Sequence, residues 1–369
     1  MVVLNKRSKG GKGVESVDDE ELYNGIMDEI SSGDIQSTMD KLLENQSFDF
    51  GNFVGKTINS GKGIDFNNIL KQVADGIVSN LNDEKSLYTN IILIALSGAV
   101  ITNFSKLLQG KRVAQMGFYT IYVLFFSVLS VSFMRTSTIA EETLTKIFDF
   151  MKVLAPTYFT CLSFTKGAGL GTGYYQITLL MLTVADFILL KFVLPGVKIY
   201  FWLRIADQLS EEEMFSKMAE FVKDILSFSM KTMSVVLMGV NVVQGMIAPL
   251  AAEAKNSALV KVGSMVPGIG NTISSAASSV LLAGSLVKNA VGVAGIVVLI
   301  IICAMPLIRL WVSEFAYKGL SAVLQPVSDK RIIKCLSMTS DAIKLLAYAV
   351  GLAAMFFAIS IAVISTMTN

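Results

Sequence analysis

The feature that most constrains this chain is a series of apolar runs, each about 18 residues or longer and able to cross a bilayer as a helix. Within a bilayer every backbone polar group must be paired inside the protein, so only helices and closed barrels can span it. The runs are continuous and lack the alternation of a barrel strand. The sequence therefore predicts an all-α, polytopic helical membrane protein with about seven or eight transmembrane helices.

Composition and charge divide the chain into two regions. Of all residues, 53% are hydrophobic and 16% are charged, whereas soluble domains carry about 25% charged residues. Residues 1–86 contain 15 acidic and 9 basic residues, while the remainder contains 14 acidic and 22 basic residues. We therefore predict an acidic region of short amphipathic helices at 1–86 and a multi-span membrane domain at 87–369.

Eight segments are candidates for the membrane spans. The third carries Asp149, Lys152 and Pro156, and the sixth is rich in small residues and preceded by helix breakers, so these two are the weakest. In chain order the candidates are Ser86–Phe104, Val113–Met134, Ile147–Phe164, Tyr174–Leu194, Phe228–Leu250, Gly268–Val287, Ala290–Trp311 and Ala342–Met367.

The sixth candidate belongs to the stretch "VPGIGNTISSAASSVLLAGSLVKNAVGVAG", Val266–Gly295. Pro267 and Gly268 prevent a helix from beginning earlier. Small residues let helices approach closely, and three of them recur every four residues in this stretch: Ser275, Ser279 and Ala283. Two interpretations remain open: a broken span that lines a substrate path, as in transporters, or a tightly packed structural helix.

The distribution of basic residues favours a crossing by the sixth candidate, because cytoplasmic loops carry an excess of Lys and Arg. If all eight segments cross and residues 1–86 lie outside, the inside loops hold 12 Lys and Arg and the outside loops hold 7. Without that crossing the tally becomes 7 inside and 12 outside, so the charge bias favours a crossing here or an odd number of crossings lost elsewhere. The inside loops would be Ser105–Arg112, Thr165–Gly173, Ala251–Pro267 and Arg309–Lys344, with the C-terminus outside.

A few polar residues lie within apolar segments. Asp186 is in the middle of the fourth span, where a charge is costly and needs a partner or a water path. Lys288 and Lys231 are its candidate partners, and we predict that Asp186 and Lys288 are coupled, either as a buried pair or across a hydrated path. Asn241 and Gln244 lie three residues apart on one face of the fifth span. All of these side chains either hold helices together or line a conduit.

Nothing in the sequence supports catalysis. The chain has no histidine, which removes the commonest general base and metal ligand. Cys161, Cys303 and Cys335 are far apart in or near apolar segments and are predicted to be small buried hydrophobes. There is no nucleophile–base pair and no metal-ligand spacing. We therefore expect no enzyme activity, no cofactor and no metal.

The Val266–Gly295 block resembles the stage III sporulation protein AE family of endospore-forming bacteria. The resemblance rests on "VPGIGNTISSAASSV", then "LLAGSLVKNAVGVAG", a long apolar span and the basic loop "DKRIIKCL", and it extends over most of residues 20–367. It implies a permease-like part of the channel, or feeding tube, that links mother cell and forespore, placed in the mother-cell-derived outer forespore membrane. Implied partners are other proteins of the stage III sporulation A operon, including a secretion-type ATPase, and indirectly the forespore protein Q.

The resemblance also nominates residues of the family's membrane core, without assigning them roles: Pro267, Gly268, Lys288, Asn289, Gly292 and Gly295. Three functions stay open at this point. The chain is a permease-like channel subunit, a non-conducting scaffold of the same complex, or a small-solute transporter unrelated to sporulation. Polar side chains that converge on one lumen would favour the first, and purely apolar packing would favour the second.

Overall fold

The structure is a computed structural model, and the residues it describes are almost entirely helical. The described backbone comprises residues 36–37, 85–100, 111–166, 168–209, 214–263 and 270–366. Almost all of the predicted region 1–86 lies outside these residues, so its helices and its placement remain predictions. The described side chains are those of 36–37, 85–100, 119–160, 163, 172–208, 214–246, 286–363 and 365.

Five helices of the described chain are long and apolar enough to cross a membrane, and the shorter apolar helix Lys85–Val100 precedes them. This confirms the all-α multi-span class, but with fewer spans than the seven or eight predicted. The second long helix is a continuous run of α6, the π-helix η1 and α7. The elements are α5 (Lys111–Lys166), α6 (Ala168–Asp186), η1 (Phe187–Val193), α7 (Leu194–Leu209), α8 (Ser216–Gly263), α9 (Gly270–Leu324) and α10 (Lys330–Thr366).

The number of spans is lower because two pairs of predicted segments are joined into single helices. Val113–Met134 and Ile147–Phe164 both belong to α5. The polar stretch between them, "RTSTIAEETLTK", contains neither Gly nor Pro, so nothing in it ends a helix. The sixth and seventh candidates are likewise parts of α9, which begins at Gly270 and continues without a break.

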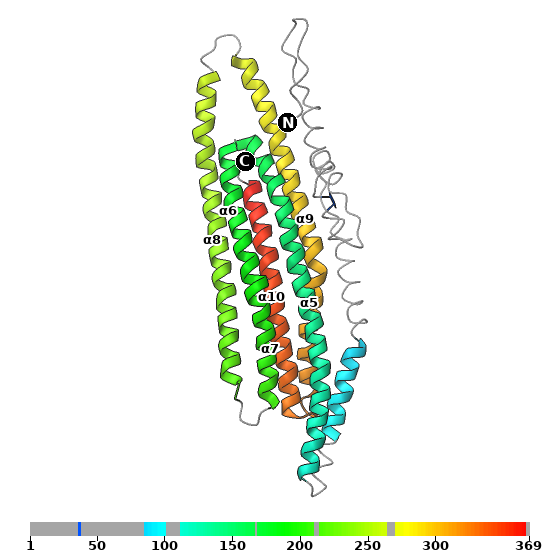
Figure 1. Ribbon diagram of the computed structural model, residues 1–369. Helices are drawn as coiled ribbons and strands as arrows, with labels where there is room; N and C mark the ends of the chain where they lie inside the picture. The colour runs from blue at the N-terminus through cyan, green and yellow to red at the C-terminus, as the bar shows by residue number, and fades with distance from the viewer. Residues whose placement is uncertain are drawn as a thin grey trace.

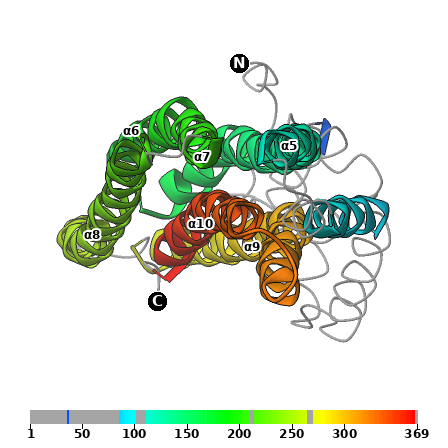
Figure 2. The ribbon, with the colours of Figure 1, turned by 90° about the horizontal axis from the view of Figure 1, so that it is seen from below.

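The helices lie side by side along one axis and alternate in direction (Figure 1). Seen along that axis, α8, α6, α7 and α5 form one row, and α10, α9 and Lys85–Val100 form a second row against it (Figure 2). Helix α10 contacts α9, α5, α7 and α8 and so occupies the centre. Aromatic pairs fill contacts within and between the rows: Phe133 on α5 stacks on Phe201 on α7 at 3.8 Å, and Phe148 on α5 meets Phe357 on α10 edge-on at 5.5 Å.

The first predicted span forms a helix that packs against the lower end of the bundle in Figure 1. Tyr88 meets the ring of Tyr317 on α9 at 5.9 Å. A Cβ added to Gly98 would lie 3.1 Å from Ile121 on α5 and 3.4 Å from Ile332 on α10. The glycine therefore lets this short helix approach two long ones closely.

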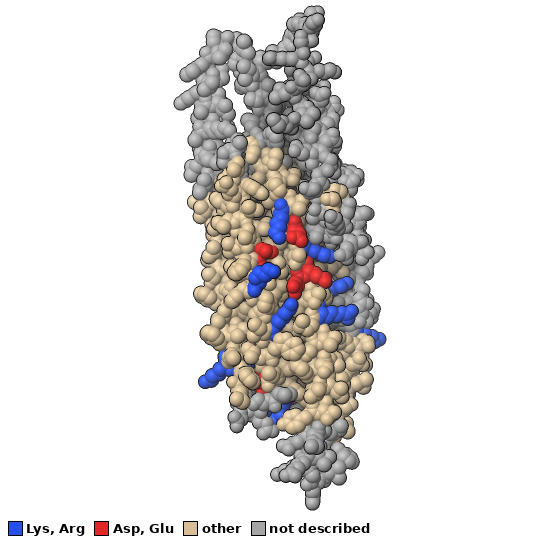
Figure 3. All heavy atoms as spheres, viewed as in Figure 1, with Lys and Arg blue, Asp and Glu red and all other residues tan. Residues whose placement is uncertain are grey.

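The bundle is longer than the hydrocarbon layer of a bilayer. Helix α5 has 56 residues, which corresponds to about 84 Å at 1.5 Å per residue, against a layer about 30 Å thick. Acidic and basic side chains gather at mid-height on one face, with an uncharged zone above them and scattered charges below (Figure 3). Ion pairs tie neighbouring helices: Glu141 to Lys198 at 2.8 Å and Asp341 to Lys223 at 3.5 Å. Part of the bundle thus lies beyond the hydrocarbon.

Candidate functional site

Lys288 is a fully buried lysine on α9 that lies against the end of α10. Its Nζ donates to the backbone carbonyl of Ser365 at 3.1 Å, and the Ser365 hydroxyl donates to Asn289 Oδ1 at 3.4 Å. Ser365 is in the last turn of α10, where helix carbonyls lack partners within the helix. That end also carries a partial negative charge. The helix end therefore stabilises the buried ammonium.

Gly292 and Gly295 follow Lys288 on α9 and allow close packing against two helices. A Cβ on Gly292 would lie 3.0 Å from the Tyr158 hydroxyl, and one on Gly295 would lie 2.8 Å from Leu154. The Tyr158 hydroxyl donates to the Ile361 carbonyl on α10 at 3.3 Å. Small residues here bring α5, α9 and α10 together, which agrees with the structural interpretation of the block.

Asn241 and Gln244 lie on α8 with only 1% and 3% of their surfaces exposed. None of their four side-chain nitrogen and oxygen atoms has a hydrogen-bond partner within the described structure. The Gln244 backbone carbonyl accepts a bond from the Tyr174 hydroxyl on α6 at 2.9 Å. A Cβ on the adjacent Gly245 would lie 3.3 Å from Val363 on α10. This part of α8 therefore packs on α6 and α10.

Two buried amides without partners are energetically unusual. Leaving a buried polar group unpaired costs about 1–3 kcal/mol, and amides in membrane helices ordinarily bond across to a neighbour. Their bonding capacity is thus free for a water molecule or a polar solute within this helix packing. This is the chemical property that most distinguishes this end of the molecule.

The lysine and the amides lie at the same level but on different sides of α10. Val363 marks the amide side and Ser365 the lysine side. Residues two apart on a helix point about 200° away from each other. The described side chains therefore place the two groups around the end of α10 without joining them in one lumen.

Asp186 does not belong to this group. It is half-buried at the junction of α6 and η1, about 18 Å along the helix from Tyr174. It has no ion pair in the part of the chain that the structure describes, so the predicted direct pair with Lys288 is not formed. Lys231, the other candidate partner, lines a groove between α8 and α9.

Other candidate residues lie partly or wholly outside the described structure. Pro267 and Gly268 precede the first described residue of α9. The backbone of Ser275, Ser279 and Ala283 is helical, but their side chains are not among those described. The ridge of small residues that they were predicted to form stays a prediction.

Tyr158, Tyr174 and Ser365 were not predicted from the sequence, and neither was Tyr122. The tyrosines could have been recognised as candidates for contacts between helices, because a buried tyrosine hydroxyl usually finds a hydrogen-bond partner. Ser365 could not have been recognised from the sequence, because its backbone carbonyl, which every residue has, is the acceptor. Tyr122 donates to the Ile205 carbonyl at 3.0 Å and lies 3.4 Å from the Cys335 sulfur. Cys303 and Cys335 are buried free thiols, as predicted.

Five long apolar helices, with buried polar groups around one end, define a multi-pass helical membrane protein. The chain matches the family model for stage III sporulation protein AE over residues 48–368 and belongs to that family. It is similar to the stage III sporulation protein AE of Bacillus subtilis (strain 168), with 23% identity over 350 residues, 95% of this chain and 85% of that protein. No solved structure matches the chain.

Proposed function

We propose that this chain is the permease-like membrane subunit of the mother cell–forespore channel complex that endospore formation requires. Membership of the family supports a role in sporulation, and the five apolar helices support a multi-pass position in a membrane. We place it in the mother-cell-derived outer forespore membrane. Its partners would be other proteins of the stage III sporulation A operon, including a secretion-type ATPase, and indirectly the forespore protein Q. The chain itself would catalyse no reaction.

The observation that carries the permease-like role is the pair of unpartnered amides, Asn241 and Gln244. A helix that serves only as packing gains nothing from two amides whose bonds are unmade, because apolar side chains of similar size avoid that cost. A path for polar solutes needs such groups to replace the solute's lost hydration. The amides therefore fit passage better than packing.

One observation favours the second candidate, a non-conducting scaffold of the same complex. Lys288, Gly292 and Gly295 are all used in close contacts among α5, α9 and α10. On this side of α10 the described helices are in close contact. Membership of the sporulation family counts against the third candidate, an unrelated small-solute transporter.

Replacing both amides by leucine separates the two candidates. The variant Asn241→Leu with Gln244→Leu removes two unpaired polar groups, so we expect it to accumulate normally and to unfold at an equal or higher temperature. If the amides serve passage, sporulation should nevertheless fall by at least about tenfold. Sporulation efficiency and protein level in sporulating cells are the two measurements.

The matched control is Val242→Leu with Val243→Leu, because these neighbours on α8 are 59% and 53% exposed and face away from the bundle. Both measurements should stay at the native level in the control. Normal sporulation of the amide variant, at normal protein level, would contradict the permease-like role and leave the scaffold.

A further inference from the structure

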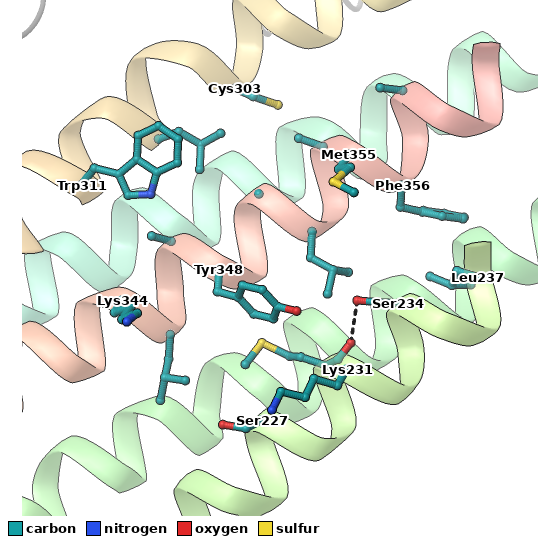
Figure 4. Close-up of a pocket in the computed structure, with 18 of the residues that line it drawn as sticks. Ser227, Lys231, Ser234, Leu237, Cys303, Trp311, Lys344, Tyr348, Met355 and Phe356 are labelled. Carbon is teal, nitrogen blue, oxygen red and sulfur yellow. Dashed lines mark hydrogen bonds between the residues drawn. The ribbon is translucent and has the colours of Figure 1, made fainter. Parts of the chain in front are cut away.

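A groove of about 1110 Å³ lies between α8 and α9, with α10 as its floor (Figure 4). Typical small-molecule sites have volumes of about 300–1,000 Å³, so the groove is large enough for a long-chain ligand. On α8 its lining runs from Lys223 to Met238, a length of about 22 Å. It does not include the amides of Asn241 and Gln244.

The two ends of the groove differ in chemistry. The ion pair between Lys223 and Asp341 marks the charged end. Toward the other end, α8, α9 and α10 contribute apolar residues such as Leu237, Leu299 and Met355. Ser234 is the polar side chain in that part, and its hydroxyl already donates to the Met230 carbonyl at 2.9 Å. The lining is therefore amphipathic along its length. Its charged side chains are Lys223, Lys231, Glu314, Asp341 and Lys344.

Two lysines of the groove are available for a ligand. Lys231 and Lys344 are exposed, and within the described chain neither forms an ion pair or a hydrogen bond. Figure 4 shows Lys231 on α8 and Lys344 on α10, with Tyr348 between them in this view. Tyr348 and Trp311 are 46% and 51% exposed beside them. Lysines with amphipathic aromatic residues are typical of the depth at which lipid headgroups lie.

We infer that this groove binds an anionic phospholipid, with its phosphate at Lys231 and Lys344 and an acyl chain along the apolar end. The side chains around the apolar end are themselves exposed, Val235 at 73% and Met355 at 53%, so this flank faces hydrocarbon and a ligand enters from the bilayer. Basic pockets between membrane helices bind anionic headgroups in this manner. The site is independent of whether the chain conducts.

A lipid fits the charge pattern better than a helix of another chain. To pair with both Lys231 and Lys344, a partner helix would have to place acidic residues opposite each of them. A phospholipid carries its phosphate at headgroup depth in any case. Each of the two lysines should favour the binding of an anionic lipid over that of a lipid without net charge by about fivefold.

Trp311 lines the groove and reports directly on a lipid bound there. The chain has two tryptophans, so Trp202→Phe leaves Trp311 as the sole indole. The full chain would be placed in nanodiscs with brominated phosphatidylglycerol or brominated phosphatidylcholine at equal mole fractions, because bromine quenches indole fluorescence on contact. We expect half-maximal quenching at a mole fraction of phosphatidylglycerol at least about fivefold lower than of phosphatidylcholine.

Two variants in this background test the two ends of the groove. Lys231→Gln with Lys344→Gln should abolish the preference for the anionic lipid, and Lys217→Gln with Lys318→Gln, which are outside the lining, should keep it. Gly351→Phe should fill the apolar end and reduce quenching by both lipids, since its Cβ would meet nothing closer than Leu307 at 3.9 Å. Gly239→Phe, with nothing within 4 Å and outside the lining, should change nothing.

Three results would overturn the inference. Equal quenching of the native groove by the two lipids would mean ordinary contact with surrounding lipid. A preference for phosphatidylglycerol that survives in the Lys231 and Lys344 variant would place the anionic site elsewhere. Little quenching by either lipid would mean that protein, for instance a second copy of the chain, covers the groove.

Discussion

The buried ammonium of Lys288 is held by the end of a helix. The Ser365 carbonyl accepts a hydrogen bond from Lys288 Nζ at 3.1 Å, in the last turn of α10, where backbone carbonyls lack partners within the helix. The sequence predicted a charged partner because only acidic side chains can be recognised as counter-ions in a sequence. A backbone carbonyl has no signature, so its role becomes visible only when the fold places the two helices together.

Shortening the chain should therefore expose the dependence of Lys288 on α10. Ending the chain after Val363 removes the Ser365 carbonyl from the buried ammonium, which should cost about 3 kcal/mol of stability because a hydrogen bond to a charged group contributes about 1.5–3 kcal/mol. Adding Lys288→Met removes that charge, so the double variant should recover most of the loss. Thermal unfolding of the purified chain in detergent measures both.

Ending the chain after Thr366 keeps the carbonyl and serves as the control, which should unfold like the full chain. If the shortened chain is no more stable with Lys288→Met than without it, the helix end does not hold the lysine. Because Asp186 forms no direct ion pair with Lys288, Asp186→Ala should gain nothing from Lys288→Met.

At the scale of the helices, glycines on α9 decide how closely it packs. A Cβ at Gly295 would already lie 2.8 Å from Leu154, whereas Gly319 on the same helix has nothing within 4 Å of its added Cβ. Gly295→Leu should hence destabilise the bundle by about 3 kcal/mol, at the upper end of what overpacking costs. Unfolding in detergent measures it.

Gly319→Leu adds the same side chain to the same helix, so both variants change helix propensity equally. It should shift stability by no more than about 0.5 kcal/mol, as surface substitutions usually do. Equal unfolding temperatures for the two variants would show that α9 does not pack against α5 through Gly295.

The existence of the helices was predictable, but not where they end. The apolar runs predicted a helix in every spanning segment, because a helix surrounded by lipid needs about 20 consecutive apolar residues. The drop in hydropathy over Arg135–Lys146 predicts a loop between two spans. Helix α5 nevertheless continues through this polar stretch, because its residues have adequate helix propensity. At the candidate site, the shared face of Asn241 and Gln244 was predictable from their spacing. Their lack of partners was not, because it depends on which helices surround them.

For the whole molecule, the joining of predicted spans into α5 and α9 changes which loops lie on the same side of the membrane. The turn between α9 and α10 lies at the end of the bundle opposite to the C-terminus and to the start of α6 (Figure 1). The charge tally instead placed Thr165–Gly173 on the same side as Arg309–Lys344. If each long helix crosses once, α5 contributes one crossing and not two, and Thr165–Gly173 then lies on the opposite side from Arg309–Lys344.

Cysteine labelling tests this arrangement in a chain whose native cysteines are replaced by alanine. Gln325→Cys is in the exposed turn between α9 and α10, near the basic residues Lys318 and Lys330. It should stay protected from a membrane-impermeant reagent until the cells are opened, because basic ends face the cytoplasm. Gly173→Cys, in open space at the other end, should be labelled in intact cells. Labelling of both positions alike in intact cells would contradict a single crossing per helix.

The length of α5 has a mechanical consequence. A rod of about 84 Å that has only about 30 Å of hydrocarbon around it extends on the order of 50 Å into water, at one end or shared between both. Because α5 is packed along its course against α6, α9 and α10, a slight tilt of the membrane part swings the distant end sideways by a larger distance. A protein bound at the far end of the bundle would therefore transmit force to the helices in the lipid without contacting the lipid itself.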